Sequence, residues 1–184
     1  MKAPTRVLLL LAAGLFLAGV SSISAQNSSK NLSPSEARIG WLKQIYGNRE
    51  WKTTETPIVL ILHDDTLFQQ FSQLVPEFMY KGAPLGARTK VYNDPAIIEQ
   101  ISPHIVFFGE NATASELSIL DVLKPTGVVT VGEQANFIKR GGTFQLDVDA
   151  DDGRDRIKLN AAGLAASKVS YRSRFLSSVR KYRP

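Results

Sequence analysis

The sequence predicts an α/β fold: a single layered domain with a mainly parallel central sheet, helices on both faces and a C-terminal antiparallel hairpin. Continuous apolar runs over 57–65, 104–110 and 127–133 are typical of parallel strands buried on both faces. Segments with helical spacing separate these runs, as in βαβ units. Alternating segments at 142–149 and 154–160 add the antiparallel pair. The pattern leaves the order of the strands open.

The first 25 residues have the order of a secretory signal peptide. Lys2 and Arg6 precede an apolar run over 7–20, and small residues follow up to Ala25. The apolar run is shorter than the roughly 20 residues that span a bilayer, so a cleaved signal peptide is favoured over an uncleaved membrane anchor. We therefore expect residues 1–25 to be removed and the mature protein to lie in the periplasm.

Composition and charge exclude several classes of protein. The chain has 184 residues, no cysteine and a formal net charge of +5. Loss of Lys2 and Arg6 with the signal peptide leaves +3, which is too little to indicate a nucleic-acid-binding protein. Without cysteine an exported protein cannot form a disulfide bond, so burial and hydrogen bonds must supply its stability and thiol-based redox switching is excluded.

The mature chain begins with a polar stretch, 26–35, which we expect to be a flexible tether before the domain at 36–184. A helix signal starts within it: Ser33 can cap a helix, Pro34 suits its first position and Glu36 completes a capping box. Apolar side chains then recur at helical spacing, at Ile39, Leu42, Ile45 and Tyr46.

Between and after the apolar runs, periodicity and Asp-Pro or glycine signals predict the remaining elements. A short strand is expected over 89–94. Helices are expected over 66–75, 95–101, 114–124 and 134–140, the last of them short and running into Gly141.

The segment 137–160 is rich in glycine and aspartate, which raises the question of a calcium loop. An EF-hand loop needs Gly at position 6 and Glu at position 12. With Asp147 at position 1, positions 6 and 12 hold Asp152 and Lys158. In the frame that puts Gly153 at position 6, two of the ligand positions hold side chains without an oxygen atom. The segment therefore does not predict a metal site.

A phosphate loop is also disfavoured, because such a loop needs a glycine run followed by a helix N-terminus and here a strand pattern follows. We interpret Gly141 and Gly142 as the end of the short helix, where one residue takes a positive φ. Asp152-Gly153 then turns the hairpin.

His63, Asp64 and Asp65 follow the first apolar run, where open α/β sheets place their ligands. The only other histidine is His104, and neither a G-x-S-x-G nor an H-E-x-x-H motif is present. Aspartate is common at the start of a helix, where it accepts hydrogen bonds from free backbone N–H groups. We interpret the three residues as a strand-to-helix turn, and we predict no catalytic residue, no metal, no cofactor and no enzymatic activity.

A series of motifs occurs in a defined order within 128–179: an apolar strand ending in T-V-G-[DE], a Phe before a glycine pair, an antiparallel hairpin, an [IL]-N step and an S-[KR]-L-L-like helix. The motif residues are Thr130-Val131-Gly132-Glu133, Phe137 with Gly141 and Gly142, Leu159-Asn160, and Ser173-Arg174-Phe175-Leu176. In order and spacing they resemble the YfiR-like family of bacterial periplasmic proteins, and the resemblance extends over nearly all the mature chain. Two departures stand out, since Lys168 replaces a usual Gly and the cysteines of the best-known members are absent.

The resemblance implies a non-enzymatic periplasmic regulator, often dimeric. Such proteins bind the periplasmic sensor domain of an inner-membrane diguanylate cyclase and hold it inactive, which lowers cyclic di-GMP output and biofilm formation. A second hypothesis is a periplasmic small-molecule binding protein whose ligand, of unknown identity, lies at the strand ends near His63 and Glu110.

The end of the chain is basic, with no acidic residue from Lys168 onward. Spacing predicts a helix over 171–182 with one apolar face, formed by Tyr171, Phe175, Val179 and Tyr182. Such a helix usually packs on the sheet and leaves a solvated basic back. The functional alternative is that Arg180, Lys181 and Arg183 steer the protein toward an acidic sensor domain or the membrane beside it. Arg174 belongs to the family motif, so we assign it a structural role.

Overall fold

The computed structural model describes residues 33–52, 54–123, 127–149 and 154–182. All of them belong to one compact unit, residues 31–184. The signal-peptide prediction for 1–25 lies outside the described residues. The strands are β1 (Ile58–Leu62), β2 (Lys90–Tyr92), β3 (Ile105–Phe108), β4 (Val129–Gly132), β5 (Phe144–Asp149), β6 (Arg154–Leu159) and β7 (Arg180–Lys181). The helices are α1 (Pro34–Asn48), α2 (Asp65–Leu74), α3 (Ile97–Gln100), α4 (Ala114–Leu117), α5 (Leu120–Leu123), α6 (Ala161–Ser167) and α7 (Ser173–Ser178), with 3₁₀ turns η1 (Val75–Glu77) and η2 (Gly86–Arg88).

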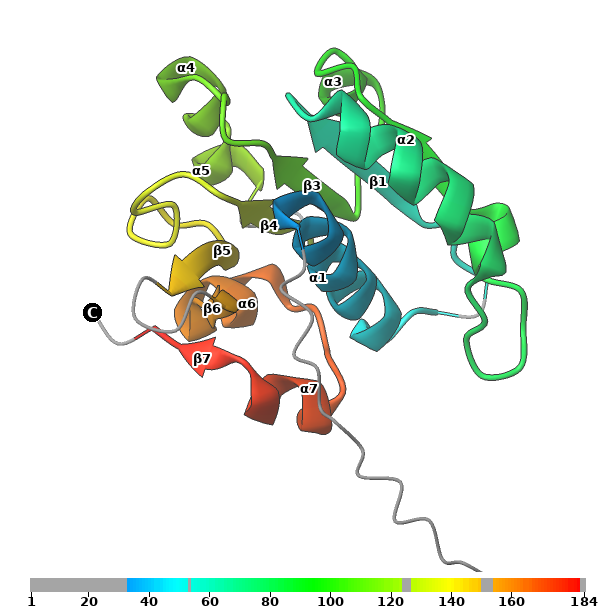
Figure 1. Ribbon diagram of the computed structural model, residues 1–184. Coiled ribbons are helices and arrows are strands. Elements are labelled where there is room, and N and C mark those ends of the chain that lie inside the picture. Colours follow the sequence, from blue (N-terminus) through cyan, green and yellow to red (C-terminus); the bar gives the residue numbers. More distant parts are fainter. Residues whose placement is uncertain (1–32, 53, 124–126, 150–153, 183–184) are drawn as a thin grey trace, which may run out of the picture. The chain divides into compact units, whose positions relative to one another are not determined.

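Within the described residues the strands form one sheet in the order β2-β1-β3-β4-β5-β6-β7 (Figure 1). Neighbouring strands are parallel, except that β5 and β6 pair antiparallel from Phe144↔Leu159 to Asp149↔Arg154. The predicted fold class is confirmed, including the hairpin. Its turn at Asp152-Gly153 lies outside the described residues.

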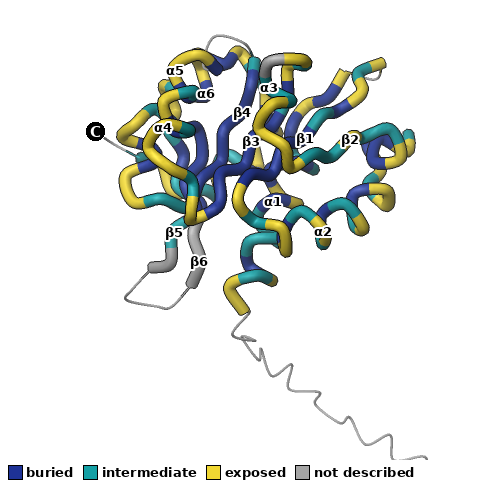
Figure 2. The backbone as a smooth tube through the Cα atoms, turned by 90° about the horizontal axis from the view of Figure 1, so that it is seen from above, coloured by how far each residue is buried: buried dark blue, intermediate teal, exposed yellow. Residues whose placement is uncertain are grey.

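The parallel strands are buried on both faces because alternate side chains enter two separate apolar clusters. One cluster lies against α1 and α2 and takes Val59, Ile61, Ile105 and Phe107. The other lies against α4 and α5 and takes Leu60, Leu62, Val106 and Phe108. Figure 2 shows the buried strands between these layers. Because β1, β3 and β4 run in the same direction, their carboxyl ends meet at one edge of the sheet.

Helix α1 begins as the sequence predicts, with a capping box. Glu36 N donates to Ser33 Oγ at 3.3 Å, and Ser33 N donates to Glu36 Oε2 at 2.8 Å. The helix starts at Pro34, so it includes the last two residues of the predicted tether. Tyr46 anchors its other end, with its ring 5.2 Å from that of Trp51.

The first and last parts of this unit are joined through backbone hydrogen bonds. Glu50 N donates to Ser170 O at 2.9 Å, and Arg172 N donates to Asn48 O at 3.0 Å. The segment that leaves α1 therefore pairs with the segment that enters α7.

The helix predicted over 114–124 is two short helices, α4 and α5. Ser118 lies at the break, where its Oγ donates to Ser115 O at 2.5 Å. A serine that bonds back to the preceding turn competes with the helical backbone, and the break lets Leu120 and Leu123 reach the second apolar cluster.

The helix predicted over 134–140 is wrong, because this segment is a series of hydrogen-bonded turns. Asn136 has a φ of 64°, which interrupts a right-handed helix. The expected positive φ in the glycine pair is confirmed at Gly141, where φ is 101°.

The helix predicted over 171–182 is also wrong, since α7 ends at Ser178 and Arg180–Lys181 form an edge strand beside β6. Val179 is already extended, and Tyr182 N donates to Leu159 O at 2.9 Å. The unpaired backbone groups of β6 offered the chain hydrogen bonds that spacing along one segment does not show. Arg183 lies outside the described residues.

Candidate functional site

The family motifs around the glycine pair surround one aromatic ring. A Cβ added at Gly132 would lie 2.4 Å from Cδ2 of Phe137, and one added at Gly142 would lie 2.1 Å from Cε1 of the same ring. Phe137 is fully buried and packs on Phe108, with ring centroids 5.7 Å apart. The two glycines therefore make room for this ring between the end of β4 and the start of β5.

Asn160 ties this cluster to α6. It is the N-cap of that helix, and its Oδ1 accepts from Gly163 N at 2.9 Å. Its Nδ2 donates to Gly142 O at 3.1 Å. Gly132, Phe137, Gly142 and Asn160 thus form one structural unit.

The S-[KR]-L-L-like motif lies apart from that unit, in α7. Ser173 and Arg174 are exposed, and the partly buried Leu176 packs against the first apolar cluster. Lys168 is the C-cap of α6 in the left-handed conformation, with φ 56° and ψ 23°. This geometry favours glycine, which is the residue that the resemblance leads one to expect there.

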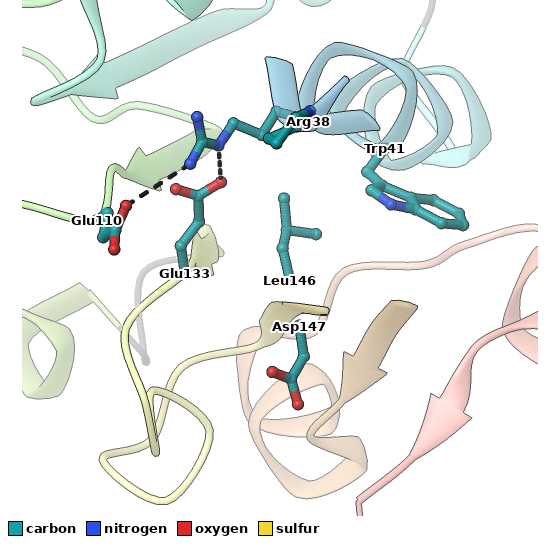
Figure 3. Close-up of a pocket in the computed structure, with 7 residues that line it drawn as sticks. Arg38, Trp41, Glu110, Glu133, Leu146 and Asp147 are labelled. Atoms are coloured by element: carbon teal, nitrogen blue, oxygen red, sulfur yellow. Dashed lines mark hydrogen bonds and ion pairs between the residues drawn. The ribbon is translucent and has the colours of Figure 1, made fainter. Parts of the chain in front are cut away.

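A cavity of about 220 Å³ opens at the carboxyl edge of the sheet, beside the start of α1. We call it the carboxyl-edge cavity; it is lined by Pro34, Arg38, Trp41, Glu110, Glu133, Leu146 and Asp147. Figure 3 shows the side chains of Arg38, Glu110 and Glu133 pointing toward one another. Arg38 Nε donates to Glu133 Oε1 at 2.5 Å, and Arg38 Nη2 lies 3.8 Å from Glu110 Oε2.

Two residues that line the carboxyl-edge cavity each carry a buried polar atom without a hydrogen-bond partner among the described residues, Glu133 at Oε2 and Trp41 at Nε1. Burial raises the pKa of the Glu133 carboxyl, and the negative charges of Asp64 and Glu110 add to this shift, while Arg38 opposes it. The sequence marked Glu133 only as part of a family motif. It missed Arg38 and Trp41, whose spacing of three residues on α1 was the available signal.

His63 lines a different hollow, of about 310 Å³, together with Asp65, Asn93 and Asn111. Its Nε2 lies 2.5 Å from Glu116 Oε1. Asp64 caps α2 by accepting from Leu67 N at 2.9 Å, as the structural interpretation predicts.

His63 and Glu110, which the small-molecule hypothesis placed at one site, therefore line separate hollows. In the part of the chain that the structure describes, no group of three His, Cys, Asp or Glu side chains is placed to hold a metal ion.

The basic residues near the C-terminus lie around an open groove. Arg180 and Lys181 are exposed on β7. The groove, of about 520 Å³, has apolar walls from Leu159, Leu164, Val169 and Leu176, and Lys168 and Lys181 also line it. We call this groove, together with the adjacent Arg180, the C-terminal basic face.

Sequence reasoning also missed a buried cation in the core. Arg49 is 6% exposed, and its Nη1 donates to His104 O at 2.6 Å. Its guanidinium lies 4.5 Å from the ring centroid of Trp51. His104 accepts from Ile58 N at Nδ1 (3.1 Å), and its Nε2 lies 2.9 Å from Glu55 Oε1. These contacts hold the starts of β1 and β3 together and indicate a structural role.

Comparison with known proteins places this fold in a family. No curated protein matches the chain. A solved structure described as a conserved domain protein from Vibrio cholerae O1 biovar El Tor is similar, with a TM-score of 0.50 and 13% sequence identity. The match covers 83% of this chain and only 61% of the other, and at this identity it shows the fold alone. The family model described as YfiR/HmsC-like matches residues 41–179, so the chain belongs to the YfiR/HmsC-like family.

Proposed function

We propose that this protein is a non-enzymatic periplasmic regulator that binds and represses the periplasmic sensor domain of an inner-membrane diguanylate cyclase. Repression lowers cyclic di-GMP signalling and biofilm formation. The observation that carries the proposal is the family match over residues 41–179. Proteins of this family are periplasmic regulators of cyclic di-GMP signalling and interact with the periplasmic sensor domain of a partner.

Export of this chain rests on the leader at 1–25, whose charged, apolar and small-residue order is typical of a signal peptide. No helix among the described residues is long and apolar enough to cross a membrane. The leader agrees with a family whose members act in the periplasm.

The contact surface that we propose is the C-terminal basic face, and we assign Arg183, which lies outside the described residues, to the same contact. Arg180 and Lys181 are exposed, and the chain carries no acidic residue from Lys168 to its end. A surface of one charge raises the rate of association with an oppositely charged partner, and salt weakens that effect. An acidic sensor domain is the partner that fits this surface.

The test measures binding of the purified mature protein to the sensor domains of cyclases encoded near its gene, together with cyclic di-GMP levels in cells. Replacing Arg180, Lys181 and Arg183 by Gln should slow association at low ionic strength by about tenfold and flatten its salt dependence. A matched variant removes three bases from other parts of the surface, Lys43, Lys139 and Arg140, and should keep the wild-type rate.

Two results would contradict the proposal. If deleting the gene leaves cyclic di-GMP unchanged and no sensor domain binds, the regulatory function is wrong. If the sensor domain binds and both variants behave alike, only the assigned surface is wrong. Light scattering on the same samples tests the homodimer that the resemblance implies.

Small-molecule binding is the second candidate function. It is favoured by the carboxyl-edge cavity, where Glu133 Oε2 and Trp41 Nε1 have no partner among the described residues. A protein that binds a small molecule tightly and ignores every sensor domain would favour this function over the first.

A further inference from the structure

We infer that the carboxyl-edge cavity binds a small organic cation, a protonated amine or guanidinium, which pairs with the carboxylate of Glu133 beside Trp41. The inference rests on the second candidate function and is independent of the proposed contact with a cyclase.

The first argument is the unused acceptor on Glu133. Its side chain is 10% exposed, and its Oε1 accepts from Arg38 while Oε2 has no donor among the described residues. Buried carboxylate oxygens are nearly always hydrogen-bonded, because leaving one without a donor costs free energy. A charged N–H group is the strongest donor for such an oxygen.

The second argument is the sign of the charge around the cavity. Arg38 is the only basic side chain among the lining residues, against the carboxylates of Glu110, Glu133 and Asp147. Lys158 pairs with Asp147 from the adjacent strand. Arg38 contacts Glu133 closely, whereas its Nη2 lies 3.8 Å from Glu110 Oε2. The Arg38 charge is thus shared between two carboxylates, and a second cation is favoured over an anion.

The third argument is the apolar and aromatic part of the lining. Leu146 lies between Glu133 and Trp41 in Figure 3, so an alkyl chain can contact it while the charged end reaches the carboxylates. Trp41 Nε1 is a buried donor without a partner among the described residues, so a ligand that also carries a hydroxyl or carbonyl oxygen would complete the site.

The cavity volume sets the size of the ligand. At about 220 Å³ it is smaller than the roughly 300–1,000 Å³ of pockets for drug-sized molecules. A cation with a short alkyl chain fits this space, whereas a peptide or a nucleotide does not.

The experiment compares three probes that share an alkyl chain and differ in charge: butylguanidine as the cation, butylurea as its neutral isostere, and pentanoate as the anion. Binding is followed by the indole N–H signals of the two tryptophans in ¹⁵N-labelled full-length mature protein. Trp41 lines the cavity, whereas Trp51 Nε1 donates to Tyr46 O at 2.9 Å inside the core. Only butylguanidine should shift the Trp41 signal with saturation, and the Trp51 signal should stay in place.

Variants identify the carboxylate that binds. Glu133→Gln keeps the size of the side chain and removes its charge, so the affinity for butylguanidine should fall about tenfold or more. Glu110→Gln, at a carboxylate that is 77% exposed, keeps the fold in any case and should weaken binding by a smaller factor. Glu77→Gln, at an exposed acid outside the cavity, is the matched control and should leave the affinity unchanged.

Each remaining outcome overturns a defined part of the inference. Equal binding of butylurea would keep a small-molecule site and overturn the cation. Preference for pentanoate would assign the site to Arg38 instead. If no probe moves the Trp41 signal, both the cation and the second candidate function at this cavity are wrong, and measured binding to a sensor domain would still decide the first function separately.

Discussion

Gly142 lies so close to Phe137 that a Cβ on this glycine would be 2.1 Å from Cε1 of the ring. Gly132 lies similarly close on the other side of the ring, where an added Cβ would be 2.4 Å from Cδ2. This contact explains why the family motifs combine a Phe with glycines at both strand ends.

Gly142→Ala should therefore destabilise the protein by about 1–3 kcal/mol, the usual cost of overpacking a core. Chemical denaturation followed by circular dichroism measures this change. Gly40→Ala is the control, since a Cβ there meets nothing within 4 Å in the middle of α1, and it should stabilise by about 0.5–1 kcal/mol. Equal stability of the two variants would contradict the close packing of Phe137.

Lys168→Gly should stabilise the protein, because Lys168 adopts a left-handed conformation at φ 56° that costs a non-glycine residue about 1–2 kcal/mol. The greater flexibility of glycine in the unfolded chain offsets part of this gain, so we expect a net increase of about 0.5–1 kcal/mol. Lys168→Ala keeps the strained backbone and should melt like the wild type. A loss of stability in Lys168→Gly would show that the lysine side chain contributes more than its backbone costs.

Stability should decrease when the solution is acidified, in part through His104. Burial lowers the pKa of His104, and the charge of Arg49 adds to this effect, while Glu55 opposes it. The folded state thus binds the proton less readily than the unfolded state, whose histidine pKa is about 6.5. Neutral His104 therefore contributes its full stabilisation of the folded state above a pH of about 6.5. This stabilisation is lost as the pH falls from there toward the lowered pKa of the folded state.

Thermal melts between neutral and mildly acidic pH measure this effect. His104→Gln should flatten the dependence. The explanation is wrong if His104→Gln and wild type lose stability in parallel.

The mature protein should begin near Gln26, because the small residues that end at Ala25 form the predicted cleavage site. Mass spectrometry of the periplasmic fraction measures the N-terminus directly. An intact chain from Met1 in the membrane fraction would show that the leader is an uncleaved anchor.

The sequence predicted the features that depend on nearby residues. The capping box of Ser33 and Glu36 spans three positions, and the hairpin needs only two adjacent alternating segments. Strands buried on both faces were predicted for the same reason, since an apolar run is a local signal.

Features that depend on distant parts of the chain were missed. Arg38 and Glu133 are 95 positions apart, and only the sheet order brings α1 to the end of β4. The C-terminal helix was wrongly extended because the edge of β6 offered Tyr182 a backbone partner at Leu159. Apolar spacing in one segment carries no information about a partner supplied by another.

The hydrogen bonds that join Glu50 to Ser170 and Asn48 to Arg172 have a consequence for folding. They link positions about 120 residues apart, and such contacts form late, after a large loss of chain entropy. The core beneath α1 cannot close until the last part of the polypeptide has arrived. For a chain that crosses a membrane from its N-terminus, folding on the far side would then finish only after nearly the whole chain has emerged there.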